Sequence, residues 1–236
     1  MKKKFSFLVL IISILYIYGS DYINEYIAEA PTFNESREII SIDEIEPYNG
    51  ENYVVINNNV PQFNLEDESL SVFEKYYELD GLGRATGGYA MIDKSLMPTE
   101  ERGSIGGVKP SGWNTIKYDI VPGKYLYNRC HLIGFQLTGE NANVNNLITG
   151  TRQFNVDSML MFENLVADYI KETGSKVLYR VTPIYEGDNL VATGVQMEGK
   201  SVEDNGNSVL FNVFVYNVHD GIDIDYLTGK SNLIEK

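Results

Sequence analysis

The fold is decided by one central stretch, which reads KYLYNRCHLIGFQL (124–137), TGENANVNN (138–146), LITGTRQFN (147–155) and VDSMLMFENLVADYIKETG (156–174). Its first part predicts a strand that ends near His131, and the polar second part predicts a loop. In its last part apolar residues recur at helical spacing, which predicts a helix. Asn155 is placed to cap the beginning of this helix and Gly174 to end it. The stretch therefore predicts a strand–loop–helix unit.

The sequence on both sides of this unit favours strands. Three strand-like segments follow it, KVLYRVTPIY (176–185), NLVATGVQMEGKSV (189–202) and VLFNVFVYNV (209–218). The short turns EGDN and EDNGN join them, so we expect an antiparallel meander. Upstream, a strand is expected near residue 53 and another near Gly88. The predicted class is α+β, with an antiparallel β-sheet core and the strand–loop–helix unit in the middle of the chain.

Three regions divide the 236 residues. Lysines 2–4 and the apolar run after them predict an export signal over residues 1–20, or a membrane anchor if it is not cleaved. Residues 21–51 are rich in acids and predict a spacer, with one short strand at 38–42. Residues 52–236 then form a single domain. The protein is expected outside the cell, either secreted or anchored by its uncleaved N-terminal segment.

The overall charge argues against a nucleic-acid partner. The formal net charge is −14, and loss of the first three lysines leaves 16 basic against 33 acidic side chains, about −17. Such a surface repels DNA at long range. Cys130 is the only cysteine, which excludes an intramolecular disulfide, so stability must come from the core or from bound metal.

Two histidines are available for chemistry. His219 lies beside a glycine turn and is expected at the surface. His131 lies at a strand end, where alternation puts Arg129 on the same face and Asn128 and Cys130 on the other. A phosphate-binding cation and a proton acceptor therefore share one side. The same alternation disfavours a Cys130–His131 nucleophile pair.

Asn155 and Glu163 are candidate metal ligands on the predicted helix. Eight residues separate them, a rotation of about 80°, so both can address one side of the helix. Amide and carboxylate oxygens suit magnesium that keeps several waters. Taken alone, the pair is better explained as a helix cap and a solvated glutamate.

The combination resembles the ββα-metal finger of the DNA/RNA non-specific endonucleases, and in particular the exported nucleases of Gram-positive bacteria. The resemblance runs through NRCHLIG, NNLITGTRQFN and MLMFENLVADYI, and extends to LDGLGRA and VEDNGNSVLFNVFVYNV, about residues 52–230 in all. The family's Asp-Arg-Gly-His signature stands here as Asn128-Arg129-Cys130-His131. Loss of the aspartate removes a negative charge, which we expect to weaken metal-water organisation or shift the pH optimum without abolishing activity.

The resemblance implies a role for each residue of the site. His131 is the general base, Asn155 holds one Mg²⁺ (with Mn²⁺ as an alternative ion), Glu163 holds a water of the metal, and Arg129 binds phosphate. The substrate is DNA, with RNA left open, and no obligate protein partner is expected. Supporting roles are implied more weakly for four further residues: Asn146, Arg152, Arg84 and Asn128.

This chemistry is compatible with an acidic protein. A cut site needs a few local cations and a metal, so we expect Arg129 in a locally positive or neutral cleft, supported by some of Arg84, Lys124 and Arg152. Contacts to phosphate carry no sequence information, which predicts cleavage without sequence preference. Two alternatives stay open: a nucleic-acid-binding module whose catalytic site has decayed, and a surface adhesin.

Overall fold

The computed structural model describes residues 40–235, except residues 65 and 70. The predicted export signal and the first part of the predicted spacer lie outside these residues. Within the described part, no helix is both long enough and apolar enough to span a membrane. The strand expected at 38–42 is described only from residue 40, and a short 3₁₀ helix, Ile42–Glu44, begins there instead.

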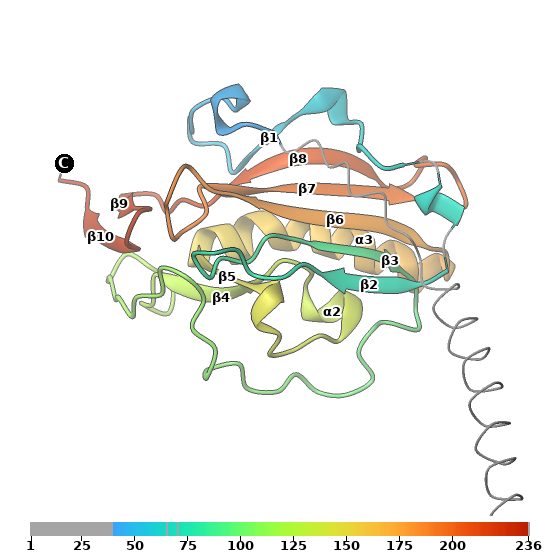
Figure 1. Ribbon diagram of the computed structural model, residues 1–236, viewed down its shortest axis with the longest axis horizontal. Coiled ribbons are helices and arrows are strands. Elements are labelled where there is room, and N and C mark those ends of the chain that lie inside the picture. The colour runs from blue at the N-terminus through green and yellow to red at the C-terminus, as the bar shows by residue number, and fades with distance from the viewer. Residues whose placement is uncertain (1–39, 65, 70, 236) are drawn as a thin grey trace, which may run out of the picture. The chain divides into compact units, whose positions relative to one another are not determined.

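An antiparallel sheet forms the body of the described chain (Figure 1). Its six strands lie in the order β1-β8-β7-β6-β3-β2, and every neighbouring pair is antiparallel. Their bounds are Tyr53–Val55 (β1), Phe73–Tyr76 (β2), Gly88–Ile92 (β3), Val177–Ile184 (β6), Gly194–Ser201 (β7) and Leu210–Tyr216 (β8). The predicted antiparallel core and the β6–β7–β8 meander are therefore confirmed.

Strand β8 shows that the sheet is covered on both faces. Val213 and Val215 belong to the main core with α3, whereas Phe214 and Tyr216 belong to a second cluster. Alternation along a strand sends these two sets to opposite faces. Both faces of β8 are thus buried, which explains its nearly continuous apolar sequence.

The second face is covered by residues 40–56, which corrects the prediction of a solvated spacer up to residue 51. Ile45 and Tyr48 pack in the cluster that contains Phe214. The Tyr48 ring lies 5.4 Å from that of Tyr216, whose hydroxyl donates to the carbonyl of Glu46 at 2.5 Å. Apolar residues recur between the acidic residues of this segment, and these apolar residues pack against the sheet.

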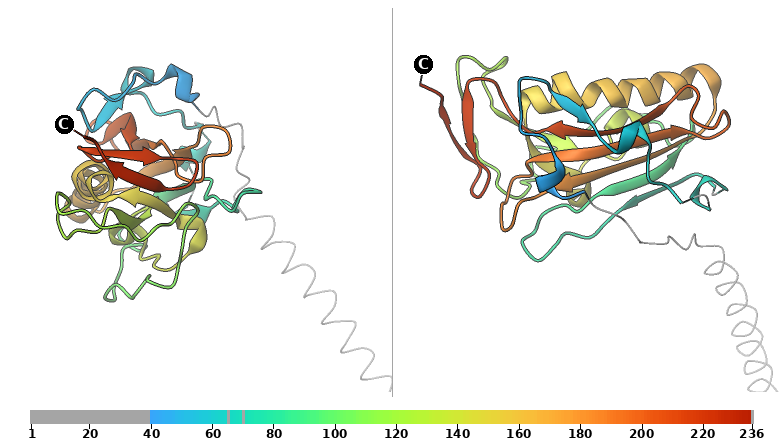
Figure 2. Two further views of the ribbon diagram at one scale, coloured as in Figure 1. Left: turned by 90° about the vertical axis from the view of Figure 1, so that its left-hand side faces the viewer. Right: turned by 90° about the horizontal axis from the view of Figure 1, so that it is seen from above.

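The strand–loop–helix unit packs beside the sheet. Strands β4 (Tyr127–His131) and β5 (Leu147–Thr151) pair antiparallel, with short helix α2 (Phe135–Thr138) between them. Helix α3 (Leu160–Thr173) follows β5 and buries Phe162, Val166 and Ile170 in the main core. The Phe162 ring lies 5.0 Å from that of Phe211 on β8. Figure 2 shows α3 running along one face of the sheet.

The beginning of this helix differs from the prediction. The main chain is already helical at Arg152, and Phe154–Met159 forms a π-helical segment before α3 proper. Thr151 rather than Asn155 supplies the cap, since its Oγ1 accepts from the Phe154 amide at 3.0 Å. Gly174, with φ 73°, ends α3 as predicted. Asn155 is thereby left free to face the site.

The last strands lie apart from the main sheet. Strand β9 (Ile222–Asp225) pairs with β10 (Lys230–Leu233) as a two-stranded ribbon. Ile222 packs with Val121 and Leu126 in a third apolar cluster, to which Trp113 is added at the edge. This cluster anchors the end of the long loop, residues 93–126, that connects β3 to β4.

Candidate active site

His131 is held by two hydrogen bonds. It ends strand β4, paired with Leu147 of β5, and its side chain is buried. One ring nitrogen, Nε2, lies 2.7 Å from the carbonyl oxygen of Asn141, and the other, Nδ1, lies 3.2 Å from Nη2 of Arg102. A carbonyl only accepts and a guanidinium only donates, so the network assigns the proton to Nε2 and a lone pair to Nδ1.

The surroundings also keep His131 neutral. Burial lowers its pKa below the ordinary 6.5, and the positive charge of Arg102 lowers it further, against the opposite effect of the Asn141 carbonyl. A neutral imidazole with a fixed lone pair can accept a proton near neutral pH.

One cavity of about 270 Å³ is lined by Arg102, His131, Asn155 and Glu163. Gly134, Phe135, Gln136 and Leu160 complete its lining. The π-helical segment carries Asn155, and such segments are frequent at functional sites because they re-aim side chains. The sequence-predicted base and both predicted metal ligands are therefore brought together.

The Glu163 carboxylate packs closely against Gly134. A Cβ at Gly134 would lie 2.3 Å from Glu163 Oε2, so any larger residue there would force the carboxylate to move. Desolvation raises the pKa of Glu163 from 4.5 to about 7, although Gln136 and Arg102 act in the other direction. The neighbouring side chains therefore supply too little positive charge to offset the desolvation of this carboxylate. A bound cation would supply the missing charge.

Arg102 is a site residue that sequence reasoning missed. It lies in the irregular loop between β3 and β4, where no periodicity or motif marks it. Its guanidinium contacts His131 Nδ1, and the residue lines this cavity and a second one of about 510 Å³. The ion pairs formed in the described part of the chain use other cations, which leaves Arg102 available for an anion.

Arg129 has a different surrounding from the one expected of a phosphate ligand. Its Nε donates to the carbonyl of Val108 and its Nη2 donates to that of Gly106 at 2.8 Å. The guanidinium also lies 4.0 Å from the ring centre of Trp113. Two of its five N–H donors therefore fasten the loop that carries Arg102.

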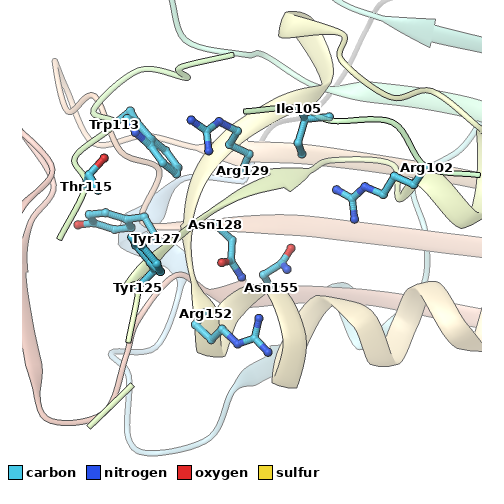
Figure 3. Close-up of a pocket in the computed structure, with 10 residues that line it drawn as sticks. All are labelled: Arg102, Ile105, Trp113, Thr115, Tyr125, Tyr127, Asn128, Arg129, Arg152 and Asn155. Atoms are coloured by element: carbon cyan, nitrogen blue, oxygen red, sulfur yellow. The ribbon is translucent and has the colours of Figure 1, made fainter. Parts of the chain in front are cut away.

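Asn128 and Arg152 line a second cavity of about 510 Å³, together with Arg129, Arg102 and Asn155 (Figure 3). This lining contains three arginines and no acid. The cleft is thus locally positive, as expected for a site that admits nucleic acid. Cys130, in contrast, is buried in the main core, as strand alternation predicts.

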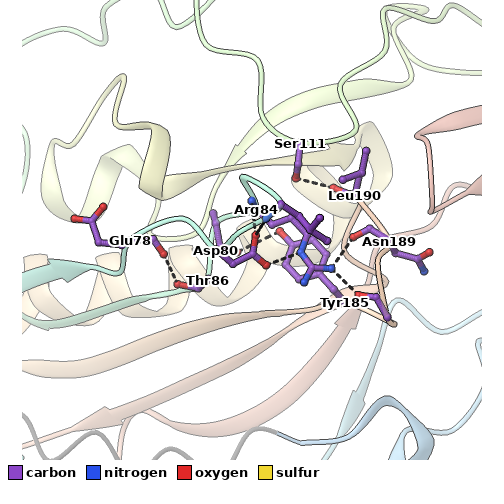
Figure 4. A network of polar contacts seen from close by, with 11 residues as sticks. Glu78, Asp80, Arg84, Thr86, Ser111, Tyr185, Asn189 and Leu190 are labelled. Atoms are coloured by element: carbon purple, nitrogen blue, oxygen red, sulfur yellow. Dashed lines mark hydrogen bonds and ion pairs between the residues drawn. The ribbon is translucent and has the colours of Figure 1, made fainter.

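Arg84 and Lys124 contribute to neither cavity lining. Arg84 pairs with Asp80 at 2.7 Å, donates to two carbonyls of the 187–189 turn, and stacks 4.5 Å from Tyr185 (Figure 4). These contacts tie two loops together and leave no free face for substrate. Lys124 is exposed and pairs with Asp119 at 2.9 Å. Of the expected cations, Arg129 and Arg152 line the cleft, and Arg102, which was not expected, lines it with them.

Asn146 and His219 have structural partners. The Asn146 carboxamide is buried and bonds both the amide and the carbonyl of Ile133, at 2.9 and 3.0 Å. It therefore fixes the main chain directly after His131. His219 is buried in its turn rather than exposed as expected, with Nδ1 3.0 Å from the carbonyl of Asp220.

An antiparallel sheet with a strand–loop–helix unit, whose histidine, asparagine and glutamate meet at one cavity, defines a nuclease of the ββα-metal class. Residues 64–203 match the family model described as DNA/RNA non-specific endonuclease. This chain belongs to the DNA/RNA non-specific endonuclease family, and the predicted fold class and enzyme class are confirmed.

Solved structures agree with this assignment. NucA from Streptococcus agalactiae with magnesium ion bound is 26% identical, with a TM-score of 0.68, over 76% of this chain and 86% of that chain. Sda1 nuclease with bound zinc ion is 28% identical, with a TM-score of 0.63, over 78% and 97%. A structure described as an extracellular endonuclease, at 20% identity and a TM-score of 0.56, shares the fold.

Proposed function

We propose that the protein is an exported, magnesium-dependent endonuclease that hydrolyses phosphodiester bonds of DNA, and of RNA, with little regard for sequence. His131 acts as the general base, Asn155 as the direct metal ligand, Glu163 as a ligand through water, and Arg102 as the cation that receives the scissile phosphate. The boundaries proposed for the parts of the chain are an export signal to residue 20 and a catalytic domain that begins by residue 52.

One observation carries this proposal. The lone pair of His131 Nδ1 faces the same cavity as Asn155 and Glu163. A base, two hard oxygen donors and a cation at one cavity are what water activation beside a phosphate requires.

The residues of the chain perform the steps as follows. His131 Nδ1 accepts a proton from a water molecule, whose oxygen attacks phosphorus while the bond to the 3′ oxygen breaks. The 3′ oxygen leaves with the bonding electron pair and takes a proton from a second water molecule. The Asn141 carbonyl holds the resulting imidazolium by its Nε2–H. Arg102 moves from Nδ1 to the phosphate oxygens, which frees the lone pair and stabilises the added charge.

A divalent ion fits this cavity. Asn155 and Glu163 offer oxygen ligands, and the described residues contain no cluster of three or more His, Cys, Asp or Glu that could enclose a metal. So few protein ligands suit Mg²⁺, which keeps most of its waters, better than Zn²⁺ in a closed site. When bound, the ion neutralises charge on the phosphate and on the departing oxygen. The magnesium in NucA and the zinc in Sda1 support a divalent ion in general.

The proposal is tested with purified protein on plasmid, single-stranded DNA and RNA, with magnesium and with a chelator. Wild-type cleavage should require the metal. Asn155→Ala should raise the magnesium concentration for half-maximal rate and lower the maximal rate, and Glu163→Ala should do so more mildly. Cleavage that survives chelation would refute the metal assignment. Binding without any cleavage would instead indicate a decayed nucleic-acid-binding module.

A further inference from the structure

The larger cavity continues the catalytic cavity toward an aromatic wall. The two cavities adjoin, because both are lined by Arg102 and Asn155, and together they are called the groove. Beyond Asn155, the groove is lined by Trp113, Tyr125 and Tyr127, which do not take part in the proposed chemistry. Figure 3 shows these rings gathered at the end of the cavity opposite Arg102.

The walls of this end combine ring faces with positive charge. Tyr125 is 48% exposed, with Lys117 Nζ 4.5 Å from its ring centre, and Trp113 carries the Arg129 guanidinium on one face. Arg152 lines the same cavity. The lining thus combines aromatic rings with cations and contains no acid. Nucleobases stack on such rings, and the cations hold the phosphates of the same strand.

The size of the cavity also suits a nucleotide. Its volume of about 510 Å³ lies within the roughly 300–1,000 Å³ typical of small-molecule sites. A scissile phosphate alone would need only the smaller cavity of about 270 Å³. The additional space is large enough for a nucleobase.

We infer that this end of the groove is a subsite for one unpaired nucleobase of the strand being cut, with Trp113 and Tyr125 as its stacking residues. The inference rests on the proposed function. A base within a duplex is paired and stacked between neighbours, so that it must leave the helix to enter the cavity. Unpaired strands enter without this cost, and the subsite favours them over duplex without reading sequence.

The first test compares the KM for a single-stranded oligonucleotide with that for the same sequence as a duplex. Tyr125→Ala should raise the KM on the single strand by about fivefold or more, the factor expected when one base loses a stacking partner. The KM on the duplex should change less. Tyr125→Phe keeps the ring and should recover the wild-type KM. Ile120→Ala is the matched control, because Ile120 is 52% exposed but lies outside the groove lining.

The second test uses the only tryptophan of the chain as a reporter. In the His131→Ala variant, which cannot consume the oligonucleotide, a single strand should quench Trp113 fluorescence. An abasic oligonucleotide of equal length and charge should quench it much less. Equal quenching by both, or equal KM changes on single strand and duplex, would overturn the subsite while leaving the nuclease intact. A wild-type protein that cleaves neither substrate would instead refute the proposed function.

Discussion

At the scale of single residues, a main-chain carbonyl and an arginine determine which ring nitrogen of His131 is basic. The hydrogen-bond network leaves the lone pair of His131 Nδ1 to accept a proton from water, so His131→Ala should reduce cleavage by about 10²- to 10⁴-fold while the protein stays folded. Plasmid cleavage and a thermal unfolding curve measure the two effects. Partial recovery with added imidazole would identify the missing group as a base.

The matched control is His219→Ala, since His219 lies outside both cavity linings and bonds only within its turn. It should cost stability rather than turnover. A His131→Ala variant that cleaves at a near-normal rate would eliminate the general-base role.

The pH dependence of cleavage follows from the same surroundings. Burial and Arg102 lower the pKa of His131, so the reactive neutral form persists below pH 6.5. At saturating metal, kcat/KM, which reports the free enzyme, should fall on the acid side with a midpoint below 6.5. Arg102→Gln removes one cause of the lowered pKa and should shift that midpoint upward. A wild-type midpoint clearly above 6.5 would contradict the neutral imidazole.

Glu163 should make the metal-free protein less stable in base. Its pKa is raised from 4.5 to about 7 in the folded state, so the folded state binds this proton more tightly than the unfolded chain does. Stability without metal therefore decreases as pH rises from about 4.5 through about 7, and the deficit is complete above that range. In chelator above pH 7, Glu163→Gln should raise Tm. Below about pH 4.5 the gain should vanish.

Glu172→Gln provides the comparison for this measurement, because Glu172 is exposed on the same helix. Its effect on Tm should be small and should not change with pH in this way. If the two variants behaved alike, the carboxylate of Glu163 would not be the desolvated group that the geometry describes.

The sequence indicates which residues lie together where a motif fixes the spacing, and their roles stay predictions. His131, Asn155 and Glu163 lie in the central stretch, and they meet at one cavity. Arg102 could not be found in this way, because its contact with His131 depends on the path of an irregular loop. Arg84 is a candidate substrate contact in the sequence. Its positive charge is equally compatible with a structural ion pair, and it pairs with Asp80.

At the scale of elements, Arg129 fastens the β3–β4 loop to strand β4. Arg129→Lys keeps the positive charge but loses the planar fork that reaches the carbonyls of Gly106 and Val108. The loop should then open more often, with faster trypsin cleavage at Arg102 and Lys109 and a lower kcat. Arg152→Lys is the control, since Arg152 lines the groove without fastening the loop. Equal protease resistance would favour direct phosphate binding by Arg129.

The regular elements were predictable and the irregular ones were not. Alternation in residues 176–218 specified the meander, and helical periodicity specified α3. The π-helical segment Phe154–Met159 has no sequence pattern of its own, because it arises where Phe154 and Met159 must both reach the core. The acidic residues of 40–51 favour a solvated spacer. The burial of this segment depends on the apolar face of β8, which lies far away in the sequence.

At the scale of the whole molecule, one acidic turn lies far from the cut site. The acidic turn at 203–207 lies near the end of α3, where Glu203 accepts from the Lys176 amide at 2.8 Å. Asn155 lies before the other end, roughly 20 Å away at about 1.5 Å per residue of α3. The groove itself is lined by arginines. A formal net charge of −14 is thus compatible with cutting a polyanion.

This distribution predicts a shallow response to salt. Salt screens the repulsion from the acidic surface and also competes at the few phosphate contacts, so the two effects oppose each other. Initial rates at fixed magnesium should decline gently from low to moderate salt, compared with a nuclease that makes about 6–10 phosphate contacts. A steep, monotonic fall would reveal a basic binding surface beyond the groove.

The order of the site along the chain has a consequence for how such an enzyme diversifies. His131, Asn155 and Glu163 are encoded within one short run of codons, on β4 and on the helical segment after β5. The six-stranded sheet supports the site and contributes no reacting atom. Drift in the outer strands and in their turns therefore changes stability or surface charge without moving the chemistry. Trp113 and Tyr125 share the β3–β4 loop with Arg102. Variation in this loop can therefore change substrate preference without loss of turnover only where Arg102 keeps its position.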